Sequence, residues 1–156
     1  MSRSILRGRV LSFLSEPQGL DDAASYRYIE DGAVSIVAGK IVAVGDFDQA
    51  MIGDAEVIDH RPHLIMAGFI DTHLHYVQSQ MIASYAGSLL EWLNTYTFVE
   101  EQKFSQQGHA GAVASAFYDE LIRNGTTTAV ADCSSAPASV DAYFAEAEKR
   151  NMLMIG

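Results

Sequence analysis

Two histidines one residue apart are the clearest chemical signal in the sequence. Residues 68–75 read Gly-Phe-Ile-Asp-Thr-His-Leu-His, so His73 and His75 close an apolar run. In an extended strand, residues i and i+2 point to the same side of the sheet. Imidazole nitrogens are ligands of zinc and of other divalent metals. The sequence therefore predicts a metal site at the end of a strand, with His73 and His75 as two ligands.

Two polar residues flank this pair. Asp71 lies two residues before His73, on the same face of the predicted strand, where its carboxylate would either orient an imidazole or cap the local backbone. Gln78 follows His75 by three residues, in the predicted loop beyond the strand. Its amide offers both a donor and an acceptor, which suits the polar edge of a purine or pyrimidine.

The remaining candidates are weaker. His60 and His63 precede the apolar run, so we expect them at the opposite end of its strand, and His109 falls in the first turns of a predicted helix. Asp132 and Cys133 follow a second apolar strand, at the same edge of the sheet as the first histidine pair. We interpret Asp132 as a structural residue near the site, and Cys133 as a small buried hydrophobic residue.

Several classes of site are excluded by missing motifs. The sequence has neither the His-x-Glu and Pro-Cys-x-x-Cys pair of cytidine-deaminase zinc sites nor the His-Glu-x-x-His motif of zincins. It also lacks a Gly-x-Gly-x-x-Gly fingerprint and a Walker A loop. The predicted metal site therefore belongs to another class.

Composition limits the partners and the compartment. The chain has 156 residues, with 20 acidic and 10 basic side chains and a net charge of −10, which argues against nucleic acid and anionic membranes as partners. A single cysteine fits a reducing compartment. We find no apolar run of the length of a membrane span and no signal peptide, and we expect a cytoplasmic protein.

The order of predicted elements indicates an α/β fold after an all-β segment. Residues 1–63 contain short β-rich runs and form the first predicted domain. Residues 64–156 form the second, which begins with a strand over 64–72 that we expect to be buried on both faces. Helices over 105–123 and 139–150 alternate with strands over 126–131 and from 152 onward. This βαβαβ order predicts a parallel sheet covered by helices.

Several of these segments resemble the amidohydrolase superfamily. The resemblance rests on Gly68–His75, on the preceding hairpin Gly39–Gly45, and on Asn124–Thr128. Two further segments, His75–Gln78 and Leu89–Phe98, are similar to the guanine-deaminating members of that superfamily. The chain departs from the common pattern inside His75–Gln78, because valine at position 77 replaces a proline that would restrict φ.

The resemblance implies a fold and an activity. Members of the superfamily are metal-dependent (β/α)₈ TIM barrels with an accessory β-sandwich, so residues 1–63 would belong to the sandwich and residues 64–156 would start an incomplete barrel. By resemblance, His73 and His75 bind one zinc per complete subunit, and Gln78 and His75 contact guanine. The reaction is hydrolysis of guanine to xanthine and ammonia in purine catabolism, by a homodimer.

The same resemblance implies that the chain carries only the N-terminal third of such an enzyme. The remaining metal ligands and the proton-shuttling carboxylate come from later strands, so no catalytic residue is assigned here, and we expect the isolated chain to be inactive. One alternative is an amidohydrolase that acts on another heterocycle, such as a triazine or pyrimidine. Another is a non-catalytic module that binds a metal weakly or docks to a partner, which a stable monomer of the isolated chain would favour.

Overall fold

The computed structural model describes residues 3–48 and 52–156, which fall into two compact units. The first unit ends at Ala67, and the second runs from Gly68 to Gly156. Among the described residues, no helix has the length and apolar character needed to cross a membrane.

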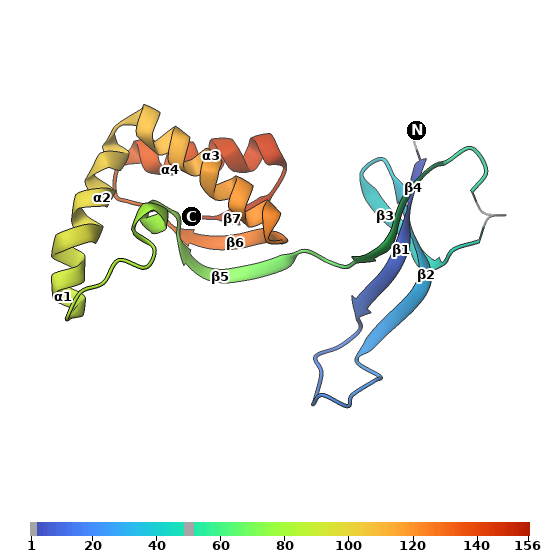
Figure 1. Ribbon diagram of the computed structural model, residues 1–156. Helices are drawn as coiled ribbons and strands as arrows, with labels where there is room; N and C mark the ends of the chain where they lie inside the picture. Colours follow the sequence, from blue (N-terminus) through green and yellow to red (C-terminus); the bar gives the residue numbers. More distant parts are fainter. Residues whose placement is uncertain (1–2, 49–51) are drawn as a thin grey trace. The chain divides into compact units, whose positions relative to one another are not determined.

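The first unit is built on one four-stranded sheet in the order β3-β2-β1-β4 (Figure 1). Its strands are β1 (Arg3–Phe13), β2 (Tyr26–Val37), β3 (Lys40–Asp46) and β4 (Glu56–Ile65). The ladders β1–β2 and β2–β3 are antiparallel, whereas β1–β4 is parallel. Val10, Ile29 and Val34 form the small apolar core on one face of this sheet. At the tight turn between β2 and β3, Ala38 and Gly39 both have positive φ, as a two-residue hairpin requires.

The apolar run at 64–72 does not form the single strand that we expected, because its first residues belong to the first sheet. Leu64 and Ile65 pair with Arg9 and Val10 in the parallel β1–β4 ladder, so they belong to β4 rather than to the histidine strand. Hydrogen bonding to β1 satisfies the backbone there, and the apolar pattern alone did not reveal which strand these residues would join. The histidine strand begins only at Phe69.

The second unit has the predicted alternation of strands and helices. The parallel strands β5 (Phe69–His75), β6 (Thr126–Asp132) and β7 (Leu153–Ile155) form a sheet in that order. The crossover helices α3 (Gln107–Arg123) and α4 (Pro137–Arg150) lie on the same face of the sheet (Figure 1). A helical segment joins β5 to α3 through η2 (Tyr76–Met81), α1 (Leu89–Trp92), η3 (Leu93–Thr97), α2 (Phe98–Gln102) and η4 (Lys103–Ser105).

Local sequence signals set the ends of the two crossover helices. Pro137 occupies the first position of α4, where the missing amide hydrogen costs no hydrogen bond. Asn151 adopts the left-handed conformation at φ 52° and ends that helix. Gly125, at φ 82°, has the same role after α3 and turns the chain into β6.

Buried aromatic rings hold the helices onto the sheet. Tyr76, Phe104, Tyr118 and Tyr143 are fully buried and contact one another in a chain of tilted and edge-on rings. The three tyrosine hydroxyl groups are satisfied: Tyr118 donates to the carbonyl of Tyr143 at 2.9 Å, Tyr76 to that of Ser139 at 2.6 Å, and Tyr143 to that of Ile155 at 3.3 Å. Burial raises the pKa of both Tyr76 and Tyr143 to about 12. This cluster therefore packs as an uncharged core.

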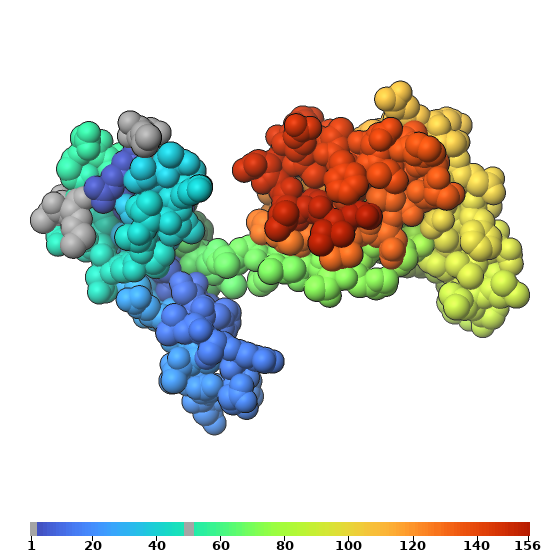
Figure 2. All heavy atoms as spheres, turned by 180° about the vertical axis from the view of Figure 1, so that it is seen from behind, coloured from blue at the N-terminus to red at the C-terminus, as the bar shows by residue number. Residues whose placement is uncertain are grey.

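The opposite face of the sheet is open, which corrects our expectation that the histidine strand is buried on both faces. Ile70 on β5 is 69% exposed, and Leu153 on β7 is 71% exposed. Atoms of β7, in dark red, lie on the surface of the second unit in Figure 2. The described helices cover only one face of this sheet, so apolar side chains on the other face stay exposed. The apolar composition had predicted burial of both faces.

Candidate active site

His73 and His75 lie with Asp132 at the carboxyl end of the parallel sheet. The two histidines end β5, and Asp132 ends β6, where it is the ladder partner of His75. The Asp132 Oδ2 atom lies 3.4 Å from His75 Nε2 and 3.8 Å from His73 Nδ1. One possible ligand atom from each of the three side chains falls within 4.8 Å of the others. The structure thus places a carboxylate beside the two predicted ligands.

This donor set fits a zinc ion. Ligand atoms about 2.0–2.1 Å from a tetrahedral metal are separated from each other by roughly 3.3 Å, close to the two separations from Asp132. Imidazole and carboxylate are also a common zinc-binding combination. The His73 side chain is 77% exposed and that of Asp132 is 59% exposed, so further ligands have room to approach.

A bulge interrupts the ladder of β5 at His73. Asp71 pairs with Ala129, but Leu74 pairs with Ala131, so β5 contains one more residue than β6 over this interval. The Asp71 Oδ1 atom accepts a hydrogen bond from the backbone N–H of His73 at 3.0 Å. Of the two roles considered for Asp71, the structure has the backbone cap.

Gln78 sits on a firmly anchored turn directly after β5. Its neighbours Tyr76 and Val77 are buried, and the Ser79 hydroxyl donates to the Tyr76 carbonyl at 2.6 Å. Val77 is only 1% exposed, so packing in the core supplies the restraint that a proline ring would have given this turn. The Gln78 Nε2 atom donates to Glu101 Oε1 on α2 at 3.1 Å.

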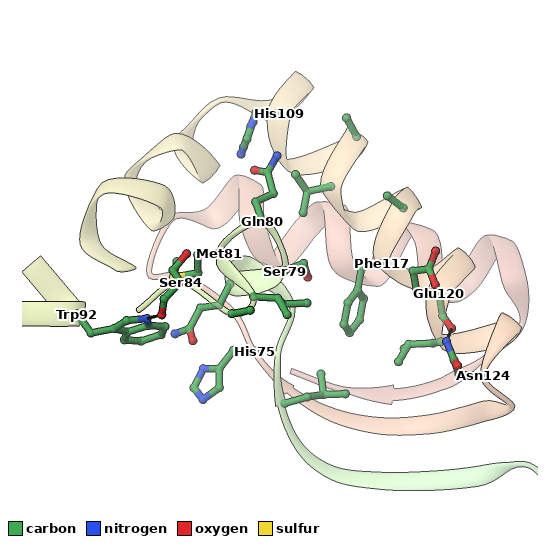
Figure 3. A pocket seen from close by; sticks show the side chains of 18 residues that line it. His75, Ser79, Gln80, Met81, Ser84, Trp92, His109, Phe117, Glu120 and Asn124 are labelled. Atoms are coloured by element: carbon green, nitrogen blue, oxygen red, sulfur yellow. Dashed lines mark hydrogen bonds between the residues drawn. The ribbon is translucent and has the colours of Figure 1, made fainter. Parts of the chain in front are cut away.

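Two cavities adjoin these residues. One, of about 890 Å³, has both His75 and Gln78 in its wall and extends along α3 as far as Asn124. In Figure 3, His75 and Trp92 lie toward one end of it and Asn124 toward the other. The other, of about 690 Å³, is lined by Glu101 and by the residues after β6, including Ser134. Glu101 carried no recognisable signal in the sequence, because glutamate on a short helix is usually only a solvated side chain.

The other sequence candidates are not members of this cluster, although Cys133 directly follows Asp132 and His109 lines the same cavity as His75. His60 and His63 belong to β4 in the first unit, not to the opposite end of the histidine strand as we expected, because that strand starts later. His109 packs its ring edge-on against Phe104 at 4.9 Å. Cys133 is half-buried, and burial, followed by the nearby charge of Asp132, raises the pKa of its thiol to about 11.

Comparison with known proteins shows the family of the chain. The sequence pattern of the Amidohydrolase family matches residues 64–156, which include β5, β6 and every residue of the histidine–aspartate cluster. The chain belongs to the amidohydrolase family. As an amidohydrolase it is similar to the guanine deaminase of Escherichia coli strain K12, with 40% identity over 92% of this chain.

Solved amidohydrolase structures extend the comparison. The crystal structure of guanine deaminase from Bradyrhizobium japonicum superposes on 99% of this chain with a TM-score of 0.92 and 30% identity. A guanine deaminase from C. acetobutylicum with guanine bound in its active site covers 98% of the chain with a TM-score of 0.78 and 26% identity. The chain spans about a third of the length of these proteins: 34% of the E. coli and B. japonicum proteins and 35% of the C. acetobutylicum one.

Proposed function

We propose that the whole protein is a guanine deaminase, which hydrolyses guanine to xanthine and ammonia. The observation that carries this proposal is the cluster of His73, His75 and Asp132 at the carboxyl ends of parallel strands, with Gln78 directly beyond it. Active sites of barrel enzymes lie at that end of the strands. The likeness to a guanine deaminase with 40% identity supports the choice of substrate.

The architecture that we infer has two parts. The first unit is part of an accessory β-sandwich, and the second is the start of a (β/α)₈ barrel. The helices of the second unit lie on one face of its parallel sheet, as in the wall of such a barrel. We also infer that the protein is a cytoplasmic homodimer when whole.

The metal would be held by the residues at the strand ends. His73 and His75 would each supply an imidazole nitrogen to one zinc ion per subunit, and Asp132 has a carboxylate oxygen within reach of the same position. When bound, the ion makes a nucleophile of water at neutral pH. Asp71 would support this binding by fixing the backbone of His73 through its hydrogen bond to the His73 N–H.

The proposed reaction replaces one bond to the purine ring by another. Water adds across the C2–N3 double bond of guanine: its oxygen bonds to the carbon that carries the 2-amino group, and one of its protons goes to N3. The added hydroxyl then gives up its proton and becomes a carbonyl as the bond from this carbon to the amino nitrogen breaks. The departing nitrogen leaves as ammonia after it has taken up a proton, which general acid catalysis supplies. Within this chain, Gln78 and His75 would bind and orient the base, since both line the same cavity. The proton-transferring group belongs to the part of the protein beyond this chain.

The test measures xanthine formation from guanine together with the zinc content of the same preparation of the whole protein. We expect turnover and about one zinc per subunit, as a single site predicts. Replacing His73 or His75 by alanine should abolish both guanine turnover and zinc binding. The same replacement of His63, which lies in the first unit, should leave turnover and zinc content unchanged. Turnover of a triazine or pyrimidine without any turnover of guanine would overturn the proposed substrate and support the alternative heterocycle.

A further inference from the structure

We propose that Glu101 is a positioning residue that decides which end of the Gln78 amide faces the substrate. Glu101 holds the amide nitrogen, so Gln78 presents its carbonyl oxygen and selects a base with an N–H donor at that place. This inference rests on the proposed function, because it assigns Gln78 a role toward a purine. It adds a residue outside the metal cluster, on the helix α2.

The direction of the Gln78 amide follows from the chemistry of its partner. Gln78 Nε2 lies 3.1 Å from Glu101 Oε1. An ionised carboxylate has lone pairs but no hydrogen, so it accepts hydrogen bonds and donates none. The NH₂ group of Gln78 must therefore face Glu101, because the reverse orientation would bring two oxygens with no hydrogen between them into contact. A hydrogen bond to a charged acceptor is also stronger than one between neutral groups.

The surroundings make this orientation persistent. The backbone of Gln78 follows two buried residues, Tyr76 and Val77, so the side chain starts from a fixed point. Glu101 is half-buried and lies on α2, which packs against the turn η2 that carries Gln78. Among the described residues, only the Gln78 amide donates a hydrogen bond to the side-chain carboxylate of Glu101. The pair also connects the walls of the two cavities, since Gln78 lines one and Glu101 the other.

A fixed amide oxygen discriminates among purines. Guanine carries a hydrogen on the ring nitrogen N1 and two on its 2-amino group, and these donors suit a carbonyl oxygen. In 2,6-diaminopurine the 2-amino group is kept, but N1 has no hydrogen, so its lone pair would face the oxygen of Gln78. An unmatched polar contact in a site built for a hydrogen bond strongly disfavours the wrong substrate. Glu101 thus acts on selectivity without touching the base.

Steady-state kinetics of the whole protein tests the proposal. In the Glu101→Ala variant we expect KM for guanine to rise about tenfold while kcat stays within about threefold, because a binding contact loses its orientation. In Glu101→Gln the new amide can still accept from Gln78 but can also donate to it. We therefore expect a smaller rise in KM and a weaker preference for guanine over 2,6-diaminopurine.

Glu100→Gln is the matched control. It removes the same charge from the neighbouring residue, whose carboxylate pairs with Lys103 at 2.6 Å rather than with Gln78. We expect wild-type KM and wild-type selectivity in this variant. Equal effects of the Glu100 and Glu101 substitutions, or an unchanged preference for guanine in Glu101→Gln, would overturn the proposal.

A second readout does not depend on catalysis. In protein labelled with ¹⁵N-glutamine, the Gln78 side-chain amide is identified as the signal that disappears in Gln78→Leu. We expect one of its protons to be shifted downfield and slow to exchange, to lose both properties in Glu101→Ala, and to keep them in Glu100→Gln. Failure of guanine turnover with this NMR pattern intact would refute the proposed substrate alone, and an NMR signal insensitive to Glu101 would refute the positioning role alone.

Discussion

Asp132 is the one member of the histidine–aspartate cluster that comes from a second strand. Its carboxylate lies within 3.8 Å of both imidazoles, so it would act on a bound zinc either as a ligand or through a histidine. Loss of a residue that orients a zinc ligand weakens zinc binding by about 10–100-fold, and loss of a ligand weakens it at least as much.

We accordingly predict that Asp132→Asn lowers the zinc affinity of the whole protein by about 10–100-fold, measured by competition with a coloured chelator. Asp141→Asn is the matched control, because Asp141 is an exposed residue of α4 and the substitution removes the same charge. Equal zinc affinity in the wild type and in Asp132→Asn would show that the Asp132 carboxylate does not contribute to zinc binding.

Cys133, next to that aspartate, should be slow to react. Burial raises the pKa of its thiol to about 11, so little thiolate exists at pH 8. We predict that iodoacetamide alkylates it on the order of a hundredfold more slowly in the native chain than in urea. The same shift implies that the folded state loses stability as the pH rises above the ordinary cysteine value, because the unfolded chain releases the thiol proton first. Equal alkylation rates in both states would contradict this.

For single residues, the sequence predicts which side chains could bind a metal better than it predicts how those side chains are positioned. Histidines two apart at the end of an apolar run were enough to predict two neighbouring imidazoles, and their rings lie 5.0 Å apart. The bulge between Asp71 and Leu74 was not predictable, because it depends on register with β6, which is 50 residues distant. The bond between Gln78 and Glu101 was missed for the same reason: it joins two helical segments whose packing no local pattern specifies.

Among the elements, the start of the histidine strand depends on a glycine. A Cβ atom at Gly68 would lie 2.1 Å from the Thr127 hydroxyl and 2.7 Å from the Thr127 Cβ, so rotation of the threonine side chain cannot relieve the clash. Gly111 on α3 is the opposite case, because a Cβ atom there has no neighbour within 4 Å.

We predict opposite effects of the same substitution at these two glycines. Gly68→Ala should destabilise the second unit by about 1–3 kcal/mol through overpacking between β5 and β6. Gly111→Ala should stabilise it by about 0.5–1 kcal/mol, because alanine favours a helix. Urea unfolding measures both changes, and a shift of the same sign in the two variants would show that the close approach at Gly68 is not a constraint.

Helices and strands were predicted most accurately where the local sequence contains a clear start or stop signal. The crossover helices were predicted to within two residues of their observed ends, and Asn124-Gly125 correctly marked the end of α3. The start of α4 was placed two residues late, because Pro137 was not used as a start signal. Strand bounds were less accurate: the strand expected over 64–72 begins only at Phe69, and Leu64 and Ile65 belong to β4. Strand ends depend on ladder partners distant in the sequence, which no local pattern contains.

For the molecule as a whole, the open sheet face has a direct physical consequence. Ile70 and Leu153 are 69% and 71% exposed, on the two edge strands of the second unit. Unpaired edges and exposed apolar side chains promote association between chains.

We therefore predict that the 156-residue chain alone self-associates with rising concentration in sedimentation velocity experiments. Charged substitutions at Ile70 and Leu153 should reduce this association, whereas a charge at Leu20, which is also exposed but lies in the first unit, should not. A monodisperse wild-type monomer would instead favour the alternative of an independent metal-binding or docking module.

The bond between Gln78 and Glu101 also bears on how new substrates arise in such enzymes. The proposed zinc-binding side chains are on the strands β5 and β6, whereas the amide that we propose to contact the base and the carboxylate that orients it are on η2 and α2. This proposed pair therefore lies in the segment between the two histidines and Asp132. Exchange of residues 78–101 between relatives would transplant a preference for one heterocycle and leave the hydrolytic machinery of the recipient in place.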